Sequence, residues 1–152
     1  MDDLPQEVKQ LLLKAAENWE NTDLSEHYIE QALHQAGDNL DVLIGAYRFF
    51  FYKNKPTIAL TIAKKVLNII QESEKLPIEW SQLHLILANR QDESLIRLYI
   101  NAYAAQGFIL AKLGQLEAAK LITQRVKEID HHRESCATTV FDVLTATPDQ
   151  DD

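Results

Sequence analysis

Apolar residues recur every three or four positions through most of the chain, which is the spacing of amphipathic helices. The first such segment begins at Pro5, a residue suited to a first helical turn, and ends near Glu20. A second follows Asp23, which together with Glu26 has the spacing of a capping box, and it ends at Gly37. The positions expected to face inward are Val8, Leu11, Leu12, Ala15, Ala16 and Trp19 in the first segment, and Leu24, Tyr28, Ile29, Ala32, Leu33 and Ala36 in the second.

The pattern predicts further helices with short turns between them. One runs from about Leu40 to Lys53 and holds most of the aromatic run AYRFFFYKNK, residues 46–55, and another starts at Pro56. Beyond them we expect a helix from Pro77 to about Ala88, a turn at NRQD, and a long helix from Glu93. The chain has only four Gly and four Pro, so few residues break helices, and an all-α fold is expected.

The succession of helix, turn and helix repeats within the chain. One constant shift, which carries Leu12 onto Ala46, superposes the first two pairs of helices, and a larger one relates the second copy to the segment YAAQGFILAKLGQLEAAKLITQRVKEID at 103–130. Equivalent positions in the first two copies are Leu12 and Ala46, Leu13 and Tyr47, Ala16 and Phe50, Ser25 and Ala59, Ile29 and Ala63, Ala32 and Val66, and Leu33 and Leu67. In the second and third copies they are Tyr47 and Gly107, Phe50 and Leu110, Asn54 and Gly114, Ala59 and Ala119, and Val66 and Val126.

These copies resemble tetratricopeptide (TPR) repeats. The clearest match is YAAQGFILAKLGQLEAAK, with Tyr103, Gly107 where two helices of such a repeat approach closely, a Leu113-Gly114 turn and Ala119. The resemblance implies a right-handed stack of antiparallel helical hairpins, a TPR-like α-solenoid. Tyr47 departs from the family pattern, which prefers a small residue at that site, so the ring should spread the local helix packing.

The repeats define an expected domain organisation. They lie at about 6–39, 40–73 and 100–133, with an inserted segment over 74–99 that contains an extra helix. A capping helix over 134–145 would close the exposed face of the last repeat, as repeat stacks require. Residues 1–146 are thus expected to form a single domain, followed by a disordered tail over 147–152.

Composition and charge narrow the class of protein. The net charge of −8 disfavours nonspecific attraction to phosphate backbones, so nucleic acid is not the expected partner. The single cysteine cannot form an internal disulfide, the N-terminus lacks the order of a secretory signal, and no apolar run is long enough to span a membrane. We expect a cytoplasmic protein that needs no cofactor to fold.

Catalytic signatures are missing from the sequence. It contains no Gly-rich phosphate loop, G-x-S-x-G, H-E-x-x-H or C-x-x-C motif, so we do not expect an enzyme. In HHRESC, residues 131–136, His132 and Cys136 are four positions apart and are weak candidates for metal ligands on one helix face. A turn with two exposed histidines and a packed cysteine is the favoured interpretation, and no metal site is assigned.

The resemblance also implies where a partner would bind, because the first helices of stacked hairpins line the concave side. The repeat phase places Arg48, Phe51 and Tyr52 in that groove, and Arg with aromatic rings is typical of binding hot spots. The other predicted groove residues are Ile44, Asn101, Phe108, Lys112 and Lys14. Burial of Phe51 and Tyr52 beneath the 74–99 insertion stays open as an alternative.

Three segments together resemble small TPR-type proteins associated with bacterial nitrogen-fixation gene clusters: DNLDVLIGAYRFFFYKN, LPIEW and RLYINAYAAQGFILAKLGQLEAAK. That resemblance implies an accessory role without catalysis. The expected function is an adaptor that binds a protein or peptide, with self-association left open. Two alternatives remain: a nucleic-acid-linked regulator that uses the basic surface between residues 48 and 65, and metal or small-molecule binding near residues 131–136.

Overall fold

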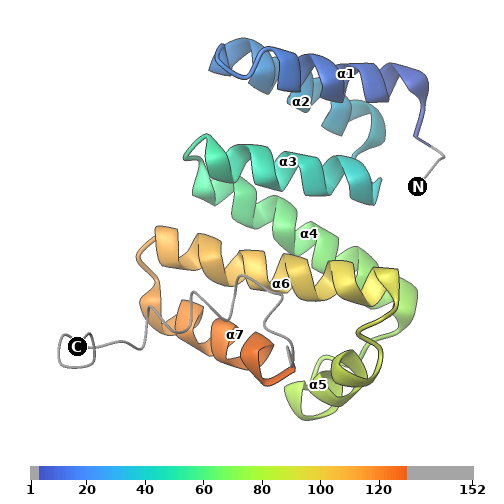
Figure 1. The fold of residues 1–152 in the computed structure, drawn as a ribbon, viewed down its shortest axis with the longest axis vertical. Coiled ribbons are helices and arrows are strands. Elements are labelled where there is room, and N and C mark those ends of the chain that lie inside the picture. Colours follow the sequence, from blue (N-terminus) through green and yellow to red (C-terminus); the bar gives the residue numbers. More distant parts are fainter. Residues whose placement is uncertain (1–3, 130–152) are drawn as a thin grey trace. The chain divides into compact units, whose positions relative to one another are not determined.

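The computed structural model describes residues 4–129, and every regular element in that range is an α-helix. The helices are α1 (Gln6–Glu17), α2 (Thr22–Ala36), α3 (Leu40–Tyr52), α4 (Pro56–Glu74), α5 (Trp80–Asn89), α6 (Ser94–Lys112) and α7 (Leu116–Ile129) (Figure 1). The all-α prediction is confirmed. In the described part of the chain, none of these helices is both long and apolar enough to cross a bilayer.

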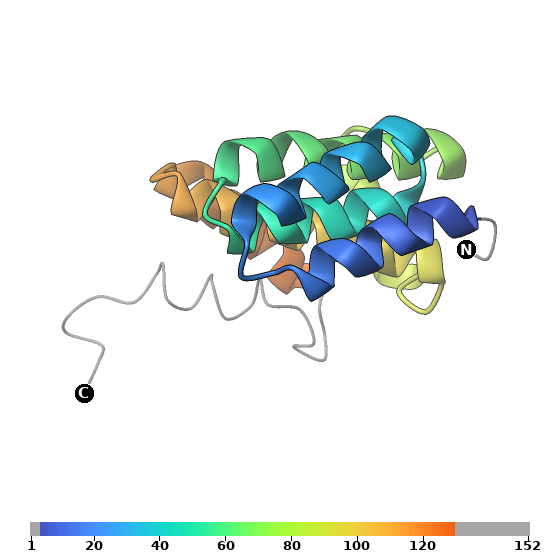
Figure 2. The same cartoon turned by 90° about the horizontal axis from the view of Figure 1, so that it is seen from above.

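The chain forms two compact units, Met1–Ile62 and Ala63–Asp152, and the division falls inside α4. In the first unit α1 packs along α2, and α2 contacts α3. In the second, α6 packs along α7, and α5 contacts α7. Figures 1 and 2 show that α1 and α2 run in opposite directions, side by side. The expectation of one domain over residues 1–146 stays a prediction.

The N-terminal ends of two helices are capped by asparagine side chains. Asn21 accepts a hydrogen bond from the backbone N–H of Leu24 at 3.2 Å, and Asn39 accepts from Asp41 at 2.9 Å and from Val42 at 3.2 Å. The predicted capping box of Asp23 with Glu26 is therefore wrong, because α2 already begins at Thr22 and the Glu26 carboxylate pairs with Lys55 instead.

The buried stripe of α1 is narrower than its apolar pattern suggests. Val8 is buried in a cluster with Leu4, Ala32 and Val42, but Ala16 is exposed and Leu13 is 55% exposed. Leu13 and Ala16 thus differ in burial from Tyr47 and Phe50, their expected equivalents in the second copy, which are both buried. Among the described residues, none covers that side of α1.

Equivalent positions in the later helices of each copy are buried alike. Ser25, Ala59 and Ala119 each have 0% exposure, and so do Ala32, Val66 and Val126. Small side chains at the first set permit close approach of neighbouring backbones. The Ser25 hydroxyl, which is buried, donates a hydrogen bond to the Asn18 carbonyl at 3.0 Å. The two shifts that relate the copies thus predict these buried positions correctly.

Two turns at equivalent positions of the second and third copies have the same backbone hydrogen bonds. After α3, the N–H of Asn54 donates to the Phe51 carbonyl at 3.1 Å and that of Lys55 to the Phe50 carbonyl at 2.7 Å. After α6, Gly114 donates to Ala111 at 3.0 Å and Gln115 to Leu110 at 2.9 Å. Asn54 has φ 63° and Gly114 has φ 82°, the left-handed conformation that ends a helix in this way.

Gly107 brings α6 and α7 together as the sequence motif predicts. A Cβ built at this position would lie 3.1 Å from Cγ2 of Ile122 and 3.1 Å from Cγ2 of Thr123, both on α7. Both of these side chains are buried. A larger residue at Gly107 would have to move packed side chains, so glycine sets the separation of the two helices.

The α5 helix begins at Trp80 rather than at the predicted Pro77. Leu76 is buried and Pro77 half-buried, so the chain packs as a loop after α4 before α5 starts. The capping helix over 134–145, the tail over 147–152 and the end of the third repeat fall outside the described residues, as do His132 and Cys136.

Candidate functional site

The aromatic run on α3 divides into buried and exposed side chains. Tyr47, Phe49 and Phe50 are buried, with exposures of 5%, 5% and 2%. Arg48 is exposed, and Tyr52 is 70% exposed. Because successive residues on a helix are about 100° apart, one face of α3 takes three rings into the core and leaves the others outside.

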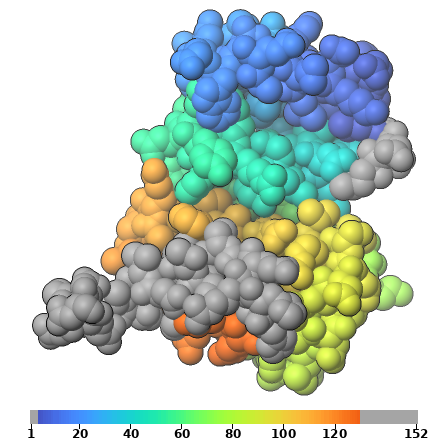
Figure 3. Space-filling view, in the orientation of Figure 1, coloured from blue at the N-terminus to red at the C-terminus, as the bar shows by residue number. Residues whose placement is uncertain are grey.

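The exposed side of α3 carries a strip that we define as Ile44, Arg48, Phe51 and Tyr52. Residues three and four apart lie on the same helix face, so Ile44 and Phe51 flank Arg48 along the axis. Ile44 and Phe51 are half-buried, and the Phe51 and Tyr52 rings meet edge to face with centroids 5.6 Å apart. Side chains of α3 reach the molecular surface in the space-filling view (Figure 3). The α3 strip therefore offers apolar surface beside one cation.

The end of α3 is fixed to the turn after α1 by Trp19 and Lys53, which are absent from the predicted site. The Trp19 and Phe49 rings meet edge to face with centroids 5.6 Å apart. The Lys53 ammonium lies 4.0 Å from the centroid of the Trp19 ring and donates a hydrogen bond to the Trp19 carbonyl. Trp19 and Lys53 are 34 residues apart, which is the shift between the first two copies, so the repeat is the signal that pairs them.

An ion pair ties α2 to the residue just before α4. Lys55 and Glu26 are hydrogen-bonded, and their side chains are 39% and 21% exposed. This hydrogen bond raises the pKa of Lys55 above its ordinary value, against the opposing effect of desolvation. The pair helps to hold the turn at which the α3 strip ends.

The remaining predicted site residues lie on α1 and α6. Lys14 is exposed on α1, and its ammonium lies 5.7 Å from the centroid of the Tyr28 ring on α2. On α6, Asn101 is half-buried, Phe108 is 36% exposed and Lys112 is exposed. Their spacing along α6 places them on one side of that helix. That these residues line a single groove with the α3 strip stays a prediction.

A second cluster, absent from the predicted site, joins α5, α6 and α7 in the second unit. Cζ of Arg125 lies 5.0 Å from the centroid of the Trp80 ring, and its Nη1 donates to the Tyr103 hydroxyl at 3.3 Å. The Trp80 and Tyr103 ring centroids are 6.0 Å apart. Tyr99 stacks on Tyr103 with centroids 6.3 Å apart, and burial raises the pKa of Tyr99 to about 12.

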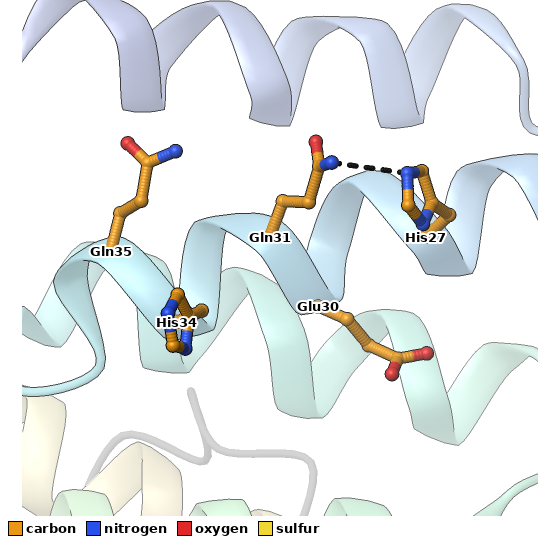
Figure 4. A pocket seen from close by; sticks show the side chains of 5 residues that line it. All are labelled: His27, Glu30, Gln31, His34 and Gln35. Atoms are coloured by element: carbon orange, nitrogen blue, oxygen red, sulfur yellow. Dashed lines mark hydrogen bonds between the residues drawn. The ribbon is translucent and has the colours of Figure 1, made fainter.

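A shallow pocket on α2 does not form a chemical site. It is lined by His27, Glu30, Gln31, His34 and Gln35, all from one helix (Figure 4). Figure 4 shows Glu30 directed away from Gln31 and Gln35, while Gln31 and His27 are joined by a 3.0 Å hydrogen bond. Over the described range, no three His, Cys, Asp or Glu side chains are grouped to hold a metal ion.

Comparison with known proteins finds a relative encoded beside a nitrogen-fixation gene. The chain is 32% identical over 134 residues to the "Uncharacterized 19.8 kDa protein in nifW 5'region" of Azotobacter chroococcum mcd 1, an alignment that covers 86% of this chain and 74% of that protein. The chain belongs to the family of that protein. The gene region of this relative agrees with the expected association with nitrogen fixation.

Other comparisons found no match. No family model matches this chain, so the tetratricopeptide resemblance has no support of that kind. No solved structure matches it either.

Proposed function

We propose that this protein is a noncatalytic adaptor that holds a protein partner on the α3 strip, as a cytoplasmic accessory factor linked to nitrogen fixation. The observation that carries the proposal is the exposure of Arg48 and Tyr52 on a helix whose other aromatic rings are mostly buried. A tyrosine that is 70% exposed beside an arginine has the composition of an interface hot spot.

The proposal includes a TPR-like arrangement of the hairpins. Equal burial at equivalent positions of the three copies supports it, as do the matching turns at Asn54 and Gly114 and the close helix approach at Gly107. In such an arrangement the first helix of each hairpin contributes to the concave face. Asn101, Phe108 and Lys112 would then have the same role on the first helix of the third copy as the α3 strip has in the second.

The link to nitrogen fixation rests on the relative encoded in the 5' region of nifW. The noncatalytic role rests on the absence of common catalytic motifs from the sequence. The exposed apolar surface of the α3 strip suits an apolar or aromatic segment, as a helix or extended peptide, that carries an acid for Arg48.

Affinity capture tests the α3 strip. The tagged full chain, produced in nitrogen-fixing cells, is compared with its Arg48→Glu and Tyr52→Ala variants, and bound proteins are identified by mass spectrometry. Both variants are expected to lose the same captured protein, because the side chains that they replace are exposed and contribute contact area and directional hydrogen bonds. Their melting temperatures should stay at the value of the unmodified chain.

Lys9→Glu is the matched control, because it makes the same charge reversal at an exposed position of α1 in the same unit. It should retain the partner. Retention by Arg48→Glu, or equal loss by Lys9→Glu, would argue against the α3 strip as the binding surface.

A further inference from the structure

The cluster of Trp80, Tyr103 and Arg125 has no role in the proposed function and comes from three helices of the second unit. All three side chains are half-buried, so the cluster is neither sealed in the core nor fully solvated. The guanidinium carbon of Arg125 lies over the indole ring, and a guanidinium that stacks on an aromatic face keeps its edge available for in-plane hydrogen bonds.

Arg125 differs from Arg90, in the same unit, in that no acidic residue of the described range 4–129 pairs with it. Arg90 forms ion pairs with both Glu74 and Glu93. Within residues 4–129, Arg125 pairs with no carboxylate and makes one hydrogen bond, the long contact of 3.3 Å to the Tyr103 hydroxyl. A guanidinium has five N–H donors, so most of the donors of Arg125 are not used by described residues.

Tyr99 adds a second polar group beside this cluster. Its side chain is only 6% exposed, and its hydroxyl makes no hydrogen bond to another residue in the described part of the chain. A buried hydroxyl without a partner loses the hydrogen bonds that it would make in water. The Tyr99 ring stacks on Tyr103, so this hydroxyl, which bonds to no described residue, belongs to the same aromatic group that supports Arg125.

We propose that Trp80, Tyr103 and Arg125 form a recognition site for a carboxylate, supplied by an aspartate or glutamate side chain of a protein partner. The stacked guanidinium binds the two carboxylate oxygens through parallel N–H donors, a geometry that Arg supplies and Lys does not. Trp80 and Tyr103 contact the backbone and the aliphatic part of the same segment. The cluster offers a single guanidinium, and the chain as a whole has a net charge of −8. A site of this charge suits one carboxylate better than a polyphosphate backbone.

Tryptophan fluorescence of the full chain tests the carboxylate site directly. The chain has two tryptophans, so Trp19→Phe leaves Trp80 as the sole reporter at the site. The probe is a short peptide of Asp, Leu, Gly and Ser with acetylated and amidated ends, and the control peptide replaces each Asp by Asn. We expect a saturable change in Trp80 emission with the Asp peptide and none with the Asn peptide.

Variants assign the binding to the guanidinium. Arg125→Gln and Arg125→Lys should each lower the affinity for the Asp peptide by about tenfold or more, because the charge-assisted bidentate hydrogen bonds are lost in both. Circular dichroism of each variant reports whether the fold is retained. Tyr103→Phe removes only the hydroxyl beside Arg125. If the fold is intact, it should lower the affinity for the Asp peptide less than Arg125→Gln does.

Three outcomes would overturn the proposal: no response to the Asp peptide, an equal response to the Asn peptide, or full retention of binding by a folded Arg125→Lys variant. An Asn peptide with a free C-terminal carboxylate distinguishes a chain terminus from an acidic side chain, and it should not bind. The site does not rest on the α3 strip, so Arg48→Glu should leave the peptide response unchanged. Failure here and failure of the proposed function are therefore separable.

Discussion

Replacement of Gly107 by alanine tests how closely α6 and α7 are held together. The new Cβ would lie 3.1 Å from methyl groups of both Ile122 and Thr123, closer than ordinary van der Waals contact. Both neighbours are β-branched and buried, and the Thr123 hydroxyl donates to the Lys120 carbonyl at 3.2 Å. Neither side chain can therefore rotate away without losing packing or a hydrogen bond.

The expected magnitude is the difference between two opposing effects. Overpacking of a filled core costs about 1–3 kcal/mol, while Gly→Ala inside a helix gains about 0.5–1 kcal/mol. We therefore expect Gly107→Ala to lower the free energy of unfolding of the second unit by about 1 kcal/mol. Unfolding in guanidinium chloride, followed by the fluorescence emission of Trp80 in the Trp19→Phe background, reports on that unit.

Gly45→Ala is the matched control, because Gly45 also lies inside a helix but its added Cβ would meet nothing within 4 Å. Only the helix-propensity gain of about 0.5–1 kcal/mol then remains, so this variant should be more stable. Trp19 and Gly45 both belong to the first unit, so Trp19 emission in the Trp80→Phe background follows the unfolding of that unit. If Gly107→Ala proved as stable as the unmodified chain, the two helices could move apart freely and the close approach would not be a constraint.

Two further predictions concern pH. Burial raises the pKa of Tyr99 to about 12, so its neutral form contributes stability that is complete below about pH 10 and is lost as the pH rises through about 12. Ultraviolet titration of tyrosinate should show a late step that Tyr99→Phe removes; ionisation of every tyrosine together near pH 10 would contradict it. The hydrogen bond from Arg90 lowers the pKa of Glu93, so its contribution is present above the ordinary glutamate pKa and is lost as the pH falls through the lower folded value. In Glu93→Gln, the free energy of unfolding measured in urea should fall less steeply as the pH is lowered into the acid range. An unchanged fall would mean that this ion pair is not coupled to folding.

Local sequence signals predict the features that depend on a few neighbouring residues. The turns at Asn54 and Gly114 need a left-handed backbone, which Asn and Gly tolerate best, so residue type alone marks them. The close approach at Gly107 is what the resemblance to tetratricopeptide repeats implies for that position, and the structure has it. The association with nitrogen fixation comes from a family resemblance, and it agrees with the relative found by comparison.

The wrong predictions arise where distant residues compete for a side chain or cover a face. Glu26 has the spacing to cap its own helix, but its carboxylate pairs with Lys55, which lies 29 residues later. Periodicity also cannot say how wide a buried stripe is, which is why Ala16 is exposed against expectation. Trp80 lies on α5 in the 74–99 insertion, outside the repeat pattern, whereas Arg125 lies on α7 in the third copy, so no spacing rule links them.

The division of the chain within α4 has a practical consequence for anyone who wishes to study half of this protein. A fragment that stops at Ile62 would end in the middle of a helix and leave its last backbone carbonyls without intrahelical partners. A fragment that starts at Ala63 would lack residues 56–62 of α4, whose carbonyls accept hydrogen bonds from the following N–H groups. Limited proteolysis should accordingly cut at the connection before α3 or at the connection after α4. The fragments from either cut would not correspond to one complete unit.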